Sequence, residues 1–572
     1  MDTIPARDEL LQHVPETPAE LGFPHTEWWE GQRMTIGRVI DALSQGYDAI
    51  FLNAPTGSGK TLIGSAIGVI LGARTTTMTH TIALQEQYRK TAPWVFASKG
   101  KRNYECGHPY EGDRPKIAKV LGVGSLNAEQ CDEHLECETP ATCPYFASIR
   151  AAAGQSQAVL NYAYAVRVCQ SPAMTRGICT AKPDDLHSEC AAPYARLNAK
   201  GDMGHRNVFV RDLAILDEGH LANAAIVQAC AIEIWDRSLQ RVGLTPPKSQ
   251  ATVDWQEWAK YALAKAQAYD AGGDVVIQTR VRNLVSRLQT LTRITVENWI
   301  VQPGKGMTKI QPLWAMSVYN RFLIRFPRLL IMSATLGNPD LLAARLGLTG
   351  YRRCAYVDVA SSFPKENRPT FYWPVVKLSS KSDTGDYATL ASAIRYIAKQ
   401  PRLAVRKGIV HTPSYKLVSQ IRQHMEREDV EPGGHTINET LYIFHEDPKH
   451  RESCVAAFRE ANYPIVLVTP SLATGFDLPY EIGWQVIAKV PFADLSDPVV
   501  RAQREYQLPN DPNFGKRCYD DDALNQVVQA AGRAVRAPDD EGVTYILDSN
   551  FWGLYKRAYA PTHFSEVLSW LN

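Results

Sequence analysis

The chain has 572 residues, a formal net charge of +2 and a hydrophobic fraction of 45%. This length exceeds what one hydrophobic core usually serves, so we expect two to four domains, and the ordinary composition excludes long disordered tracts. The near-neutral charge excludes nucleic-acid binding through a chain-wide basic excess, so such binding would need a local groove. No apolar run reaches the roughly 20 residues of a membrane span, and residues 1–10 lack the apolar stretch of a signal peptide. We therefore expect a cytoplasmic protein with no membrane partner.

Short apolar runs bounded by turn or charged residues predict strands that are buried on both faces, as in parallel sheets. In chain order they lie at 49–52, 213–216, 329–332, 408–410, 465–468, 486–488 and 545–547. Helical periodicities separate several of them, for example at 62–71 and 415–425. Alternating strands and helices predict an α/β fold with two parallel-sheet domains.

Two segments break this alternation. Between about 226 and 322, apolar residues recur at steps of three and four, which predicts amphipathic helices. Residues 99–145 show neither a helical nor a strand period and contain four of the 11 cysteines. Something other than a hydrophobic core is expected to hold this second segment together.

A phosphate-binding loop follows the first predicted strand and opens a helix. It comprises Thr56, Gly57, Ser58, Gly59, Lys60 and Thr61. Glycines let backbone N–H groups approach phosphates, Lys60 can reach the β and γ oxygens, and Thr61 can offer its hydroxyl to Mg²⁺. We therefore expect ATP and Mg²⁺ as cofactors.

An acidic pair follows the strand at 213–216. Asp217 is predicted to hold Mg²⁺ and Glu218 to orient or deprotonate the attacking water, while His220 would link this site to the rest of the domain. Without the loop upstream, the same pair would be interpreted as a solvated turn.

Two arginines near the C-terminus complete the predicted catalytic set. Arg533 and Arg536 are expected on one face of a helix that begins near residue 524, with Gln529 one turn earlier. Arginines placed across a domain cleft can neutralise charge on the γ-phosphate as its bond breaks. The alternative is a solvated helix with two surface arginines.

These motifs occur in the order of a superfamily 2 helicase, which the chain resembles. The motifs are Gln32, the phosphate-binding loop, 217–220, 333–335, 474–477 and 529–536. Within that superfamily the chain resembles the XPD/DinG iron–sulfur group, through 79–81, 84–87, 102–109, 143–145, 161–162 and 362–364. Gly219 stands where this group usually has alanine, a difference of one methyl group that we expect to be tolerated.

The resemblance implies an ATP-hydrolysing, DEAH-like DNA helicase that moves 5′ to 3′ on single-stranded DNA and unwinds forked or tailed duplex DNA. It implies nucleotide contacts by Gln32 and Asp477 and a monomeric motor acting in DNA repair or replication, near the nucleoid if the source is bacterial or phage-derived. RNA or RNA–DNA helicases would share the same ATPase residues. A strand-stimulated translocase that remodels nucleoprotein complexes without unwinding is a third alternative.

The resemblance also implies a domain plan. Residues 1–98, 151–225 and 326–364 would form a first RecA-like motor domain, and 365–572 a second one. Residues 99–150 would form an inserted iron–sulfur cluster domain, and 226–325 a helical arch domain.

Four cysteines are the candidate cluster ligands, namely Cys106, Cys131, Cys137 and Cys143. Four thiolates suit Zn²⁺ or a 4Fe-4S cluster, and spacing alone does not decide between them. The resemblance favours 4Fe-4S. Farther along, Cys169, Cys179, His187 and Cys190 could form a small zinc site, or Cys190 could replace one of the four assigned ligands, because residues 190–195 resemble 143–147. We expect instead that these residues bind no metal.

Single strands are gripped by polar and basic groups along the backbone together with aromatic stacking. The candidates for these contacts are Thr79, His80, Arg102, Tyr162, Thr412 and Thr474.

Overall fold

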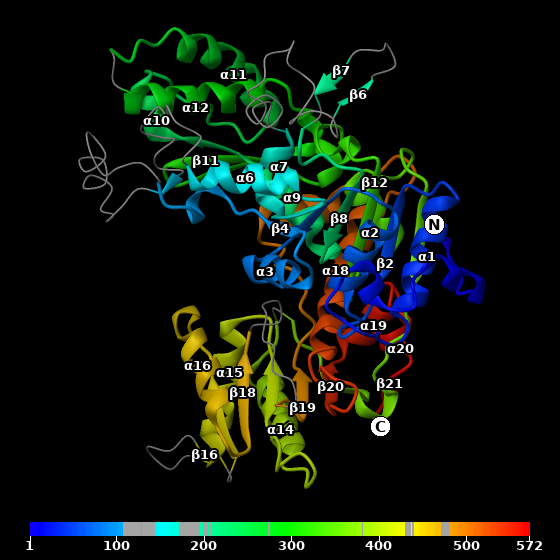
Figure 1. Ribbon diagram of the computed structural model, residues 1–572. Helices are drawn as coiled ribbons and strands as arrows, with labels where there is room; N and C mark the ends of the chain where they lie inside the picture. The colour runs from blue at the N-terminus through cyan, green and yellow to red at the C-terminus, as the bar shows by residue number, and fades with distance from the viewer. Residues whose placement is uncertain are drawn as a thin grey trace.

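The computed structural model describes residues 1–106, 127–128, 143–170, 195–197, 203–205, 207–272, 275–379, 381–429, 436–437, 440–470 and 481–571. Two α/β domains lie one above the other, and a smaller arch lies beyond the first of them (Figure 1). Among the described residues, no helix is long and apolar enough to cross a membrane.

The first domain is built on an eight-stranded parallel sheet in the order β1-β13-β2-β12-β8-β3-β5-β4. The strands are β1 (Asp2–Thr3), β13 (Cys354–Asp358), β2 (Ala49–Asn53), β12 (Arg328–Ser333), β8 (Leu213–Asp217), β3 (Thr75–Thr79), β5 (Gln157–Asn161) and β4 (Val95–Ala97). The expected strands at 49–52, 213–216 and 329–332 are confirmed. They occupy the centre of the sheet, where both faces are covered and an uninterrupted apolar run is stable.

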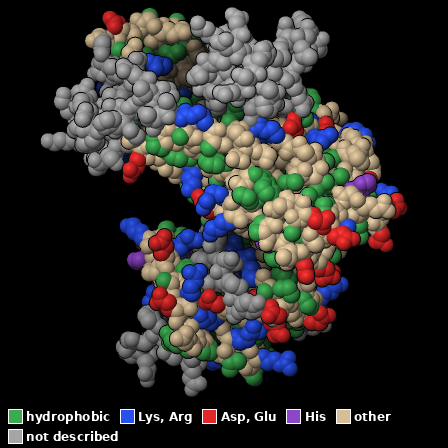
Figure 2. Space-filling model, in the orientation of Figure 1, with side chains coloured by type: hydrophobic (Ala, Val, Ile, Leu, Met, Phe, Trp, Pro, Cys, Tyr) green, Lys and Arg blue, Asp and Glu red, His purple; other side chains and the backbone are tan. Residues whose placement is uncertain are grey.

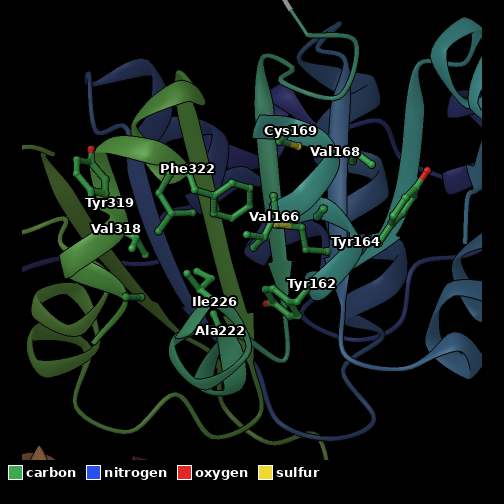
Figure 3. Close-up of a cluster of buried hydrophobic side chains, with 14 of the residues drawn as sticks. Tyr162, Tyr164, Val166, Val168, Cys169, Ala222, Ile226, Val318, Tyr319 and Phe322 are labelled. Atoms are coloured by element: carbon green, nitrogen blue, oxygen red, sulfur yellow. The ribbon is translucent and has the colours of Figure 1, made fainter. Parts of the chain in front are cut away.

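Helices cover both faces of this sheet. One face carries α1 (Gln32–Ser44), α2 (Lys60–Ile70) and α3 (Ile82–Thr91), whose apolar residues share one buried cluster with the sheet. The other face carries α7 (Tyr162–Gln170), α9 (Ala222–Ala229) and α13 (Pro339–Leu346). Figure 3 shows Val166 of α7 beside Phe322 in this second core, which also contains Cys169 of α7 and Ile226 of α9.

The arch combines helices with a small sheet. Its helices are α10 (Asp236–Arg241), α11 (Thr252–Gln267) and α12 (Val275–Leu291). Trp255, Ala259 and Ala262 of α11 are buried at steps of three and four, facing Leu284 and Leu288 of α12. The expectation of helices alone was incomplete, because β9 (Ile232–Trp235), β10 (Trp299–Gly304) and β11 (Met307–Pro312) form an antiparallel sheet.

The second domain contains another eight-stranded sheet, in the order β16-β17-β18-β15-β19-β20-β14-β21, in which only β16 is antiparallel to its neighbour. The strands are β14 (Thr370–Val376), β15 (Gly408–His411), β16 (Thr436–Ile437), β17 (Thr440–Phe444), β18 (Ile465–Thr469), β19 (Trp484–Ile487), β20 (Val543–Asp548) and β21 (Leu568–Trp570). Its helices are α14 (Thr384–Ala398), α15 (Tyr415–Asp429), α16 (Arg451–Glu460), α17 (Pro498–Glu505), α18 (Phe514–Ala531), α19 (Asn550–Tyr555) and α20 (Thr562–Ser565). The fold class predicted from the sequence, two parallel-sheet domains, is confirmed.

Helix α18 touches the first domain at both ends. Near its start, Phe514 and Cys518 are buried in one apolar cluster with Leu313, Trp314 and Leu341. Around this cluster, Arg345 of α13 pairs with Asp522 (2.5 Å), and the backbone N–H of Asn338 donates to Asp521 (2.9 Å). We call these residues the docking contact. The other end of α18 reaches the nucleotide site described next.

Candidate nucleotide site

The phosphate-binding loop lies between β2 and α2. Gly57 and Gly59 have φ angles of +84° and +71°, a left-handed conformation that glycine adopts without steric cost. The ammonium of Lys60 donates to the carbonyls of Ala54 (3.1 Å) and Pro55 (3.4 Å). The hydroxyl of Ser58 is buried and has no hydrogen-bond partner among the described residues. A phosphate group would supply acceptors for both side chains, so the loop fits the nucleotide that the sequence predicts.

Gln32 supports this loop from the first turn of α1. Its side-chain oxygen accepts from the backbone N–H of Trp29 (2.9 Å), and its amide nitrogen donates to the carbonyl of Ser58 (3.0 Å). The side chain is buried. In this conformation Gln32 therefore orients the loop, whereas the sequence predicted a direct contact with the nucleotide.

The acidic pair lies at the carboxyl end of β8. Asp217 is buried, and this burial together with the neighbouring Glu218 raises the pKa of its carboxyl to about 7, against the opposing effect of Lys60. Glu218 has a φ of +51°, the only positive value of a non-glycine residue in the described part of the chain. Such strain is found where function requires a fixed geometry. It aims the Glu218 side chain into the cleft between the domains.

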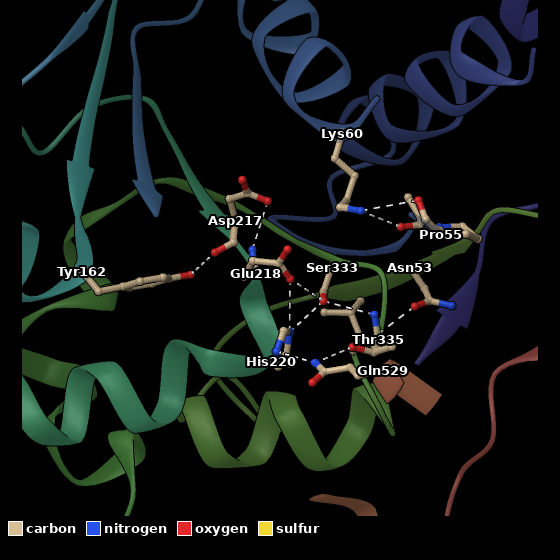
Figure 4. Close-up of polar contacts among 12 residues, drawn as sticks. Asn53, Pro55, Lys60, Tyr162, Asp217, Glu218, His220, Ser333, Thr335 and Gln529 are labelled. Atoms are coloured by element: carbon tan, nitrogen blue, oxygen red, sulfur yellow. Dashed lines mark hydrogen bonds and ion pairs between the residues drawn. The ribbon is translucent and has the colours of Figure 1, made fainter. Parts of the chain in front are cut away.

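A chain of hydrogen bonds connects Glu218 to the second domain (Figure 4). Ser333 donates to the Glu218 carboxylate (3.3 Å), and Ser333 lies 2.7 Å from Nδ1 of His220. Gln529 of α18 lies 2.7 Å from the other ring nitrogen of His220, and it donates to the hydroxyl of Thr335 (2.8 Å). Burial lowers the pKa of His220, so the ring is neutral at pH 7 and can both donate and accept.

Gly219 is required by its neighbours, not merely tolerated. A Cβ at this position would lie 2.3 Å from Cγ2 of Ile331 in β12. The methyl of the usual alanine would therefore collide with this side chain, so isoleucine at 331 favours glycine at 219.

The two domains enclose a cleft of about 370 Å³. The first domain contributes Thr56, Glu218 and His220 to its lining, and the second contributes Gln529, Arg533 and Arg536. Burial and, to a smaller extent, the adjacent Arg536 lower the pKa of Arg533 to about 10, so Arg533 remains charged at pH 7. Two half-buried like charges that line the cleft opposite the phosphate-binding loop form a site for an anion.

The helix before these arginines differs from the prediction. Helix α18 begins at Phe514, ten residues earlier than expected, and ends at Ala531. Arg533 and Arg536 thus lie in the turn that follows the helix, not on a helical face. Their spacing of three is typical of a helix, but Gly532 ends α18 before either arginine.

Phe363 is a site residue that the sequence indicated only as a family marker. It packs with Ala534 and Val535, next to the arginines, and a Cβ at Gly57 would lie 2.3 Å from its ring. The ring therefore lies between the phosphate-binding loop and the arginine turn. Its position among residues 362–364, shared with the XPD/DinG group, was the available signal.

Three candidate nucleic-acid contacts are buried. Thr79, Tyr162 and Thr412 are each at most 2% exposed, and the hydroxyl of Tyr162 donates to the backbone carbonyl of Asp217 (2.9 Å). A buried ring cannot stack on a base, so Tyr162 braces the acidic pair instead. His80 and Arg102 are exposed. The other candidate, Thr474, lies outside the described residues, as does the predicted nucleotide contact Asp477.

The cysteines of the predicted cluster are only partly described. Cys106 is half-buried and Cys143 is buried, whereas Cys131 and Cys137 lie outside the described residues. The rings of Tyr104 and Tyr145, each two residues from one of the described cysteines, are in contact at 5.8 Å. The described residues contain no group of three metal-binding side chains. The two cysteines are thus held in the same region.

Cys169 does not fit a second metal site. It is fully buried on α7, and burial raises the pKa of its thiol to about 12. The thiol lies in the apolar core and donates to the carbonyl of Phe209 (3.7 Å), so a core position accounts for this cysteine without a metal. Cys179, His187 and Cys190 lie outside the described residues.

Comparison with known proteins agrees with this architecture. Residues 397–566 match the Helicase C-terminal domain family. The match to an XPD helicase structure covers 95% of this chain and 100% of the helicase chain, with 15% sequence identity and a TM-score of 0.56. The chain has the XPD helicase fold. The Xpd4 structure of S. tokodaii gives 15% identity over 95% of this chain and 100% of its own, with a TM-score of 0.54. No curated protein sequence matches this chain.

The XPD fold places the nucleotide site between two RecA-like domains. At 15% identity these structures establish the architecture, and the helicase family match supports a helicase. The chemistry of the site rests on the residues described above.

Proposed function

We propose that this protein is an ATP-dependent DNA helicase that translocates 5′ to 3′ on single-stranded DNA and unwinds duplex DNA. One observation carries the proposal. The phosphate-binding loop and acidic pair of the first domain face Gln529, Arg533 and Arg536 of the second across a single cleft. Because one chain supplies both sides, a monomer can form the complete site.

The residues of the cleft suit ATP hydrolysis. Lys60 would neutralise the β and γ oxygens, and Glu218 would orient water and accept its proton. Thr61 and Asp217 would hold Mg²⁺, which neutralises charge on the phosphates when bound. Arg533 and Arg536 would approach the γ-phosphate only when the cleft is closed. Hydrogen bonds from Gln529 through His220 and Ser333 would couple that closure to the orientation of Glu218.

A route for the strand is supported by the surface. Figure 2 shows a hollow between the two domains with Lys and Arg side chains around it. Helix α3 lies above this gap, and α15 and α16 lie below it (Figure 1). His80 and Thr81, just before α3, line the cleft and are exposed. Polar and basic groups on both sides suit a phosphate backbone.

We further propose a 4Fe-4S cluster held by Cys106, Cys131, Cys137 and Cys143. The contact between Tyr104 and Tyr145 brings the two described cysteines to one region, as shared ligation requires. The role we assign to the cluster is structural, since residues 99–145 lack the apolar periodicity of a self-sufficient core.

Partial duplexes test the proposed reaction. Protein purified without oxygen should separate a DNA duplex with a 5′ overhang, and not one with a 3′ overhang, in the presence of ATP and Mg²⁺. Equal activity on RNA-tailed substrates would favour the RNA helicase alternative. Strand-stimulated ATP hydrolysis without strand separation would favour a translocase.

Metal analysis tests the cluster. The purified protein should contain about four iron and four sulfide per chain. Cys106→Ser should lose iron, whereas Cys454→Ser on α16 is the matched control and should keep it. Stoichiometric zinc in a colourless wild-type protein would refute the cluster.

A further inference from the structure

The cleft between the domains extends beyond the residues that we propose for the phosphates. His563 of α20 lines it together with Phe363, Phe564 and Val567. The His563 side chain is half-buried, and its Nδ1 atom is buried without a hydrogen-bond partner among the described residues. Most buried polar atoms in proteins have such a partner, and a ligand in the cleft would supply one.

The backbone of His563 is held in place independently of its ring. The carbonyl of His563 accepts from the guanidinium of Arg368. Arg368 also donates to the carbonyl of Phe363 (3.2 Å) and to the carboxylate of Glu566 (2.6 Å). These contacts fix the wall of the cleft and leave the imidazole free to meet a ligand. Because Arg368 is paired with Glu566, it is not a free cation for a phosphate.

The residue before His563 contacts the first domain, so α20 lies against that domain (Figure 1). The hydroxyl of Thr562 donates to the carboxylate of Asp358 (3.1 Å), at the carboxyl end of β13. Strand β2, from which the phosphate-binding loop starts, has β13 on one side and β12 on the other, and β8 with the adjoining Glu218 follows beyond β12. These strands are parallel, so their carboxyl ends share one edge of the sheet. His563 and Glu218 therefore lie on opposite sides of the loop.

A nucleoside triphosphate bound to the loop would span these two sides. The proposed site has the γ-phosphate near Glu218 and the β-phosphate at the loop. The base is the end of the nucleotide farthest from the γ-phosphate, so it would lie on the side of His563.

The chemistry of this side suits a base. Its walls include the rings of Phe363 and Phe564, and sites for small aromatic ligands combine apolar walls with a few polar groups. Burial is the main cause that lowers the pKa of His563 to about 4, and the nearby Asp358 opposes it. The ring is therefore neutral at pH 7, with one N–H donor and one acceptor. Such a group matches the polar edge of a neutral base and adds no charge for a phosphate.

We propose that the imidazole of His563 forms a hydrogen bond with the base of the bound nucleotide. This inference rests on the proposed ATPase function and adds a base-binding residue to it. The second domain then contacts both ends of the nucleotide, the γ-phosphate through Arg533 and Arg536 and the base through His563.

The test uses His563→Phe, which keeps an aromatic ring without nitrogen, and His563→Asn, which keeps a donor and an acceptor. His424→Phe is the matched control, because His424 of α15 is buried, stacks on Tyr387 and lies outside the lining of the cleft. Calorimetry with Mg²⁺ gives the Kd of each protein for ADP and for ribose 5-diphosphate, which differ only in the base. The KM and kcat for ATP with single-stranded DNA and the unfolding midpoint are measured as well.

His563→Phe should raise the Kd for ADP and the KM for ATP about fivefold, as expected for one lost hydrogen bond between neutral groups. Its Kd for ribose 5-diphosphate and its kcat should stay unchanged, because neither depends on the base. His563→Asn should keep most of the wild-type affinity for ADP. His424→Phe should leave both Kd values unchanged, whatever its unfolding midpoint.

Three results would overturn the inference: an unchanged Kd for ADP in His563→Phe, equal losses for ADP and ribose 5-diphosphate, or equal losses for ADP in the Phe and Asn variants. If the wild-type protein shows the predicted binding but separates no duplex, the proposed helicase function fails and the role of His563 stands. A wild-type protein that binds no nucleotide would overturn both.

Discussion

The two contacts between the domains differ in chemistry. At the docking contact, apolar side chains surround the Arg345 pairs, and Trp314 packs edge-on against Phe514 at 5.5 Å. At the cleft, by contrast, the domains meet through polar groups such as Gln529, His220 and Thr335. Apolar packing stabilises two surfaces only while they stay in contact. Polar groups can instead replace a lost hydrogen-bond partner by water or by a ligand. The docking contact is therefore suited to act as a hinge, and the cleft to open and close.

This contrast predicts that variants at the docking contact lose stability, and that variants in the cleft lose ATP turnover. Helix α18 joins the two regions, since Phe514 lies at its start and Gln529 in its last turn.

Of these variants, Arg345→Ala should have the largest effect, and this effect should be a loss of the free energy of unfolding. Arg345 is buried between Asp522 and the carbonyl of Cys518, so its removal leaves Asp521 buried without a counter-charge. Breaking such a pair costs about 3–5 kcal/mol. Urea unfolding followed by tryptophan fluorescence should show the loss. Arg406→Ala, whose pair with Glu541 is more exposed at 3.9 Å, is the control and should change stability little. Equal stability of the two variants would contradict the hinge.

Lys60→Ala should have the opposite effect, a large loss of ATP turnover with little loss of stability. Loss of a charge-stabilising donor costs about 10²- to 10³-fold in turnover. Because the hydrogen bonds that Lys60 makes within the described residues go to the backbone carbonyls of Ala54 and Pro55, the unfolding midpoint should change little. A coupled assay for ADP release, with and without single-stranded DNA, gives the measurement. Retained DNA-stimulated turnover would refute the assignment of the loop.

Gln529→Ala should reduce turnover less, by about tenfold, because it removes hydrogen bonds and no charge. Its effect should depend on His220, so the double variant with His220→Ala should be no worse than His220→Ala alone. Additive losses in this double-mutant cycle would show that the chain from Gln529 to Glu218 does not act as a unit.

Asp521→Asn should have the smallest effect, visible as a change in pH dependence. Burial raises the pKa of Asp521 to about 7, with Arg345 opposing and Asp522 adding to the shift. The folded protein then binds more protons than the unfolded chain between about pH 4 and 7, so this group makes the free energy of unfolding fall as pH rises through that range. Asparagine can still accept from the N–H of Asn338. Denaturant titrations at several pH values should show a flatter profile for the variant.

The sequence predicted best what is encoded within a few neighbouring residues. The phosphate-binding loop was recognisable because Gly57 and Gly59 supply left-handed backbone and Lys60 follows at once. The central strands were recognisable because burial on both faces leaves an uninterrupted apolar run. The antiparallel strands of the arch were missed because the neighbouring helical periodicity dominated the pattern.

The sequence alone was enough to predict the two parallel-sheet domains and the residues that we propose for the ATP site, since loop, strand and glycine signals are local. Which of these side chains face the cleft depends on how the domains pack. Tyr162 and Thr79 are buried, and Arg533 lies beyond the end of α18. Burial and orientation depend on elements that are distant in the chain, such as α3 and β8, and spacing along the sequence does not record how these pack.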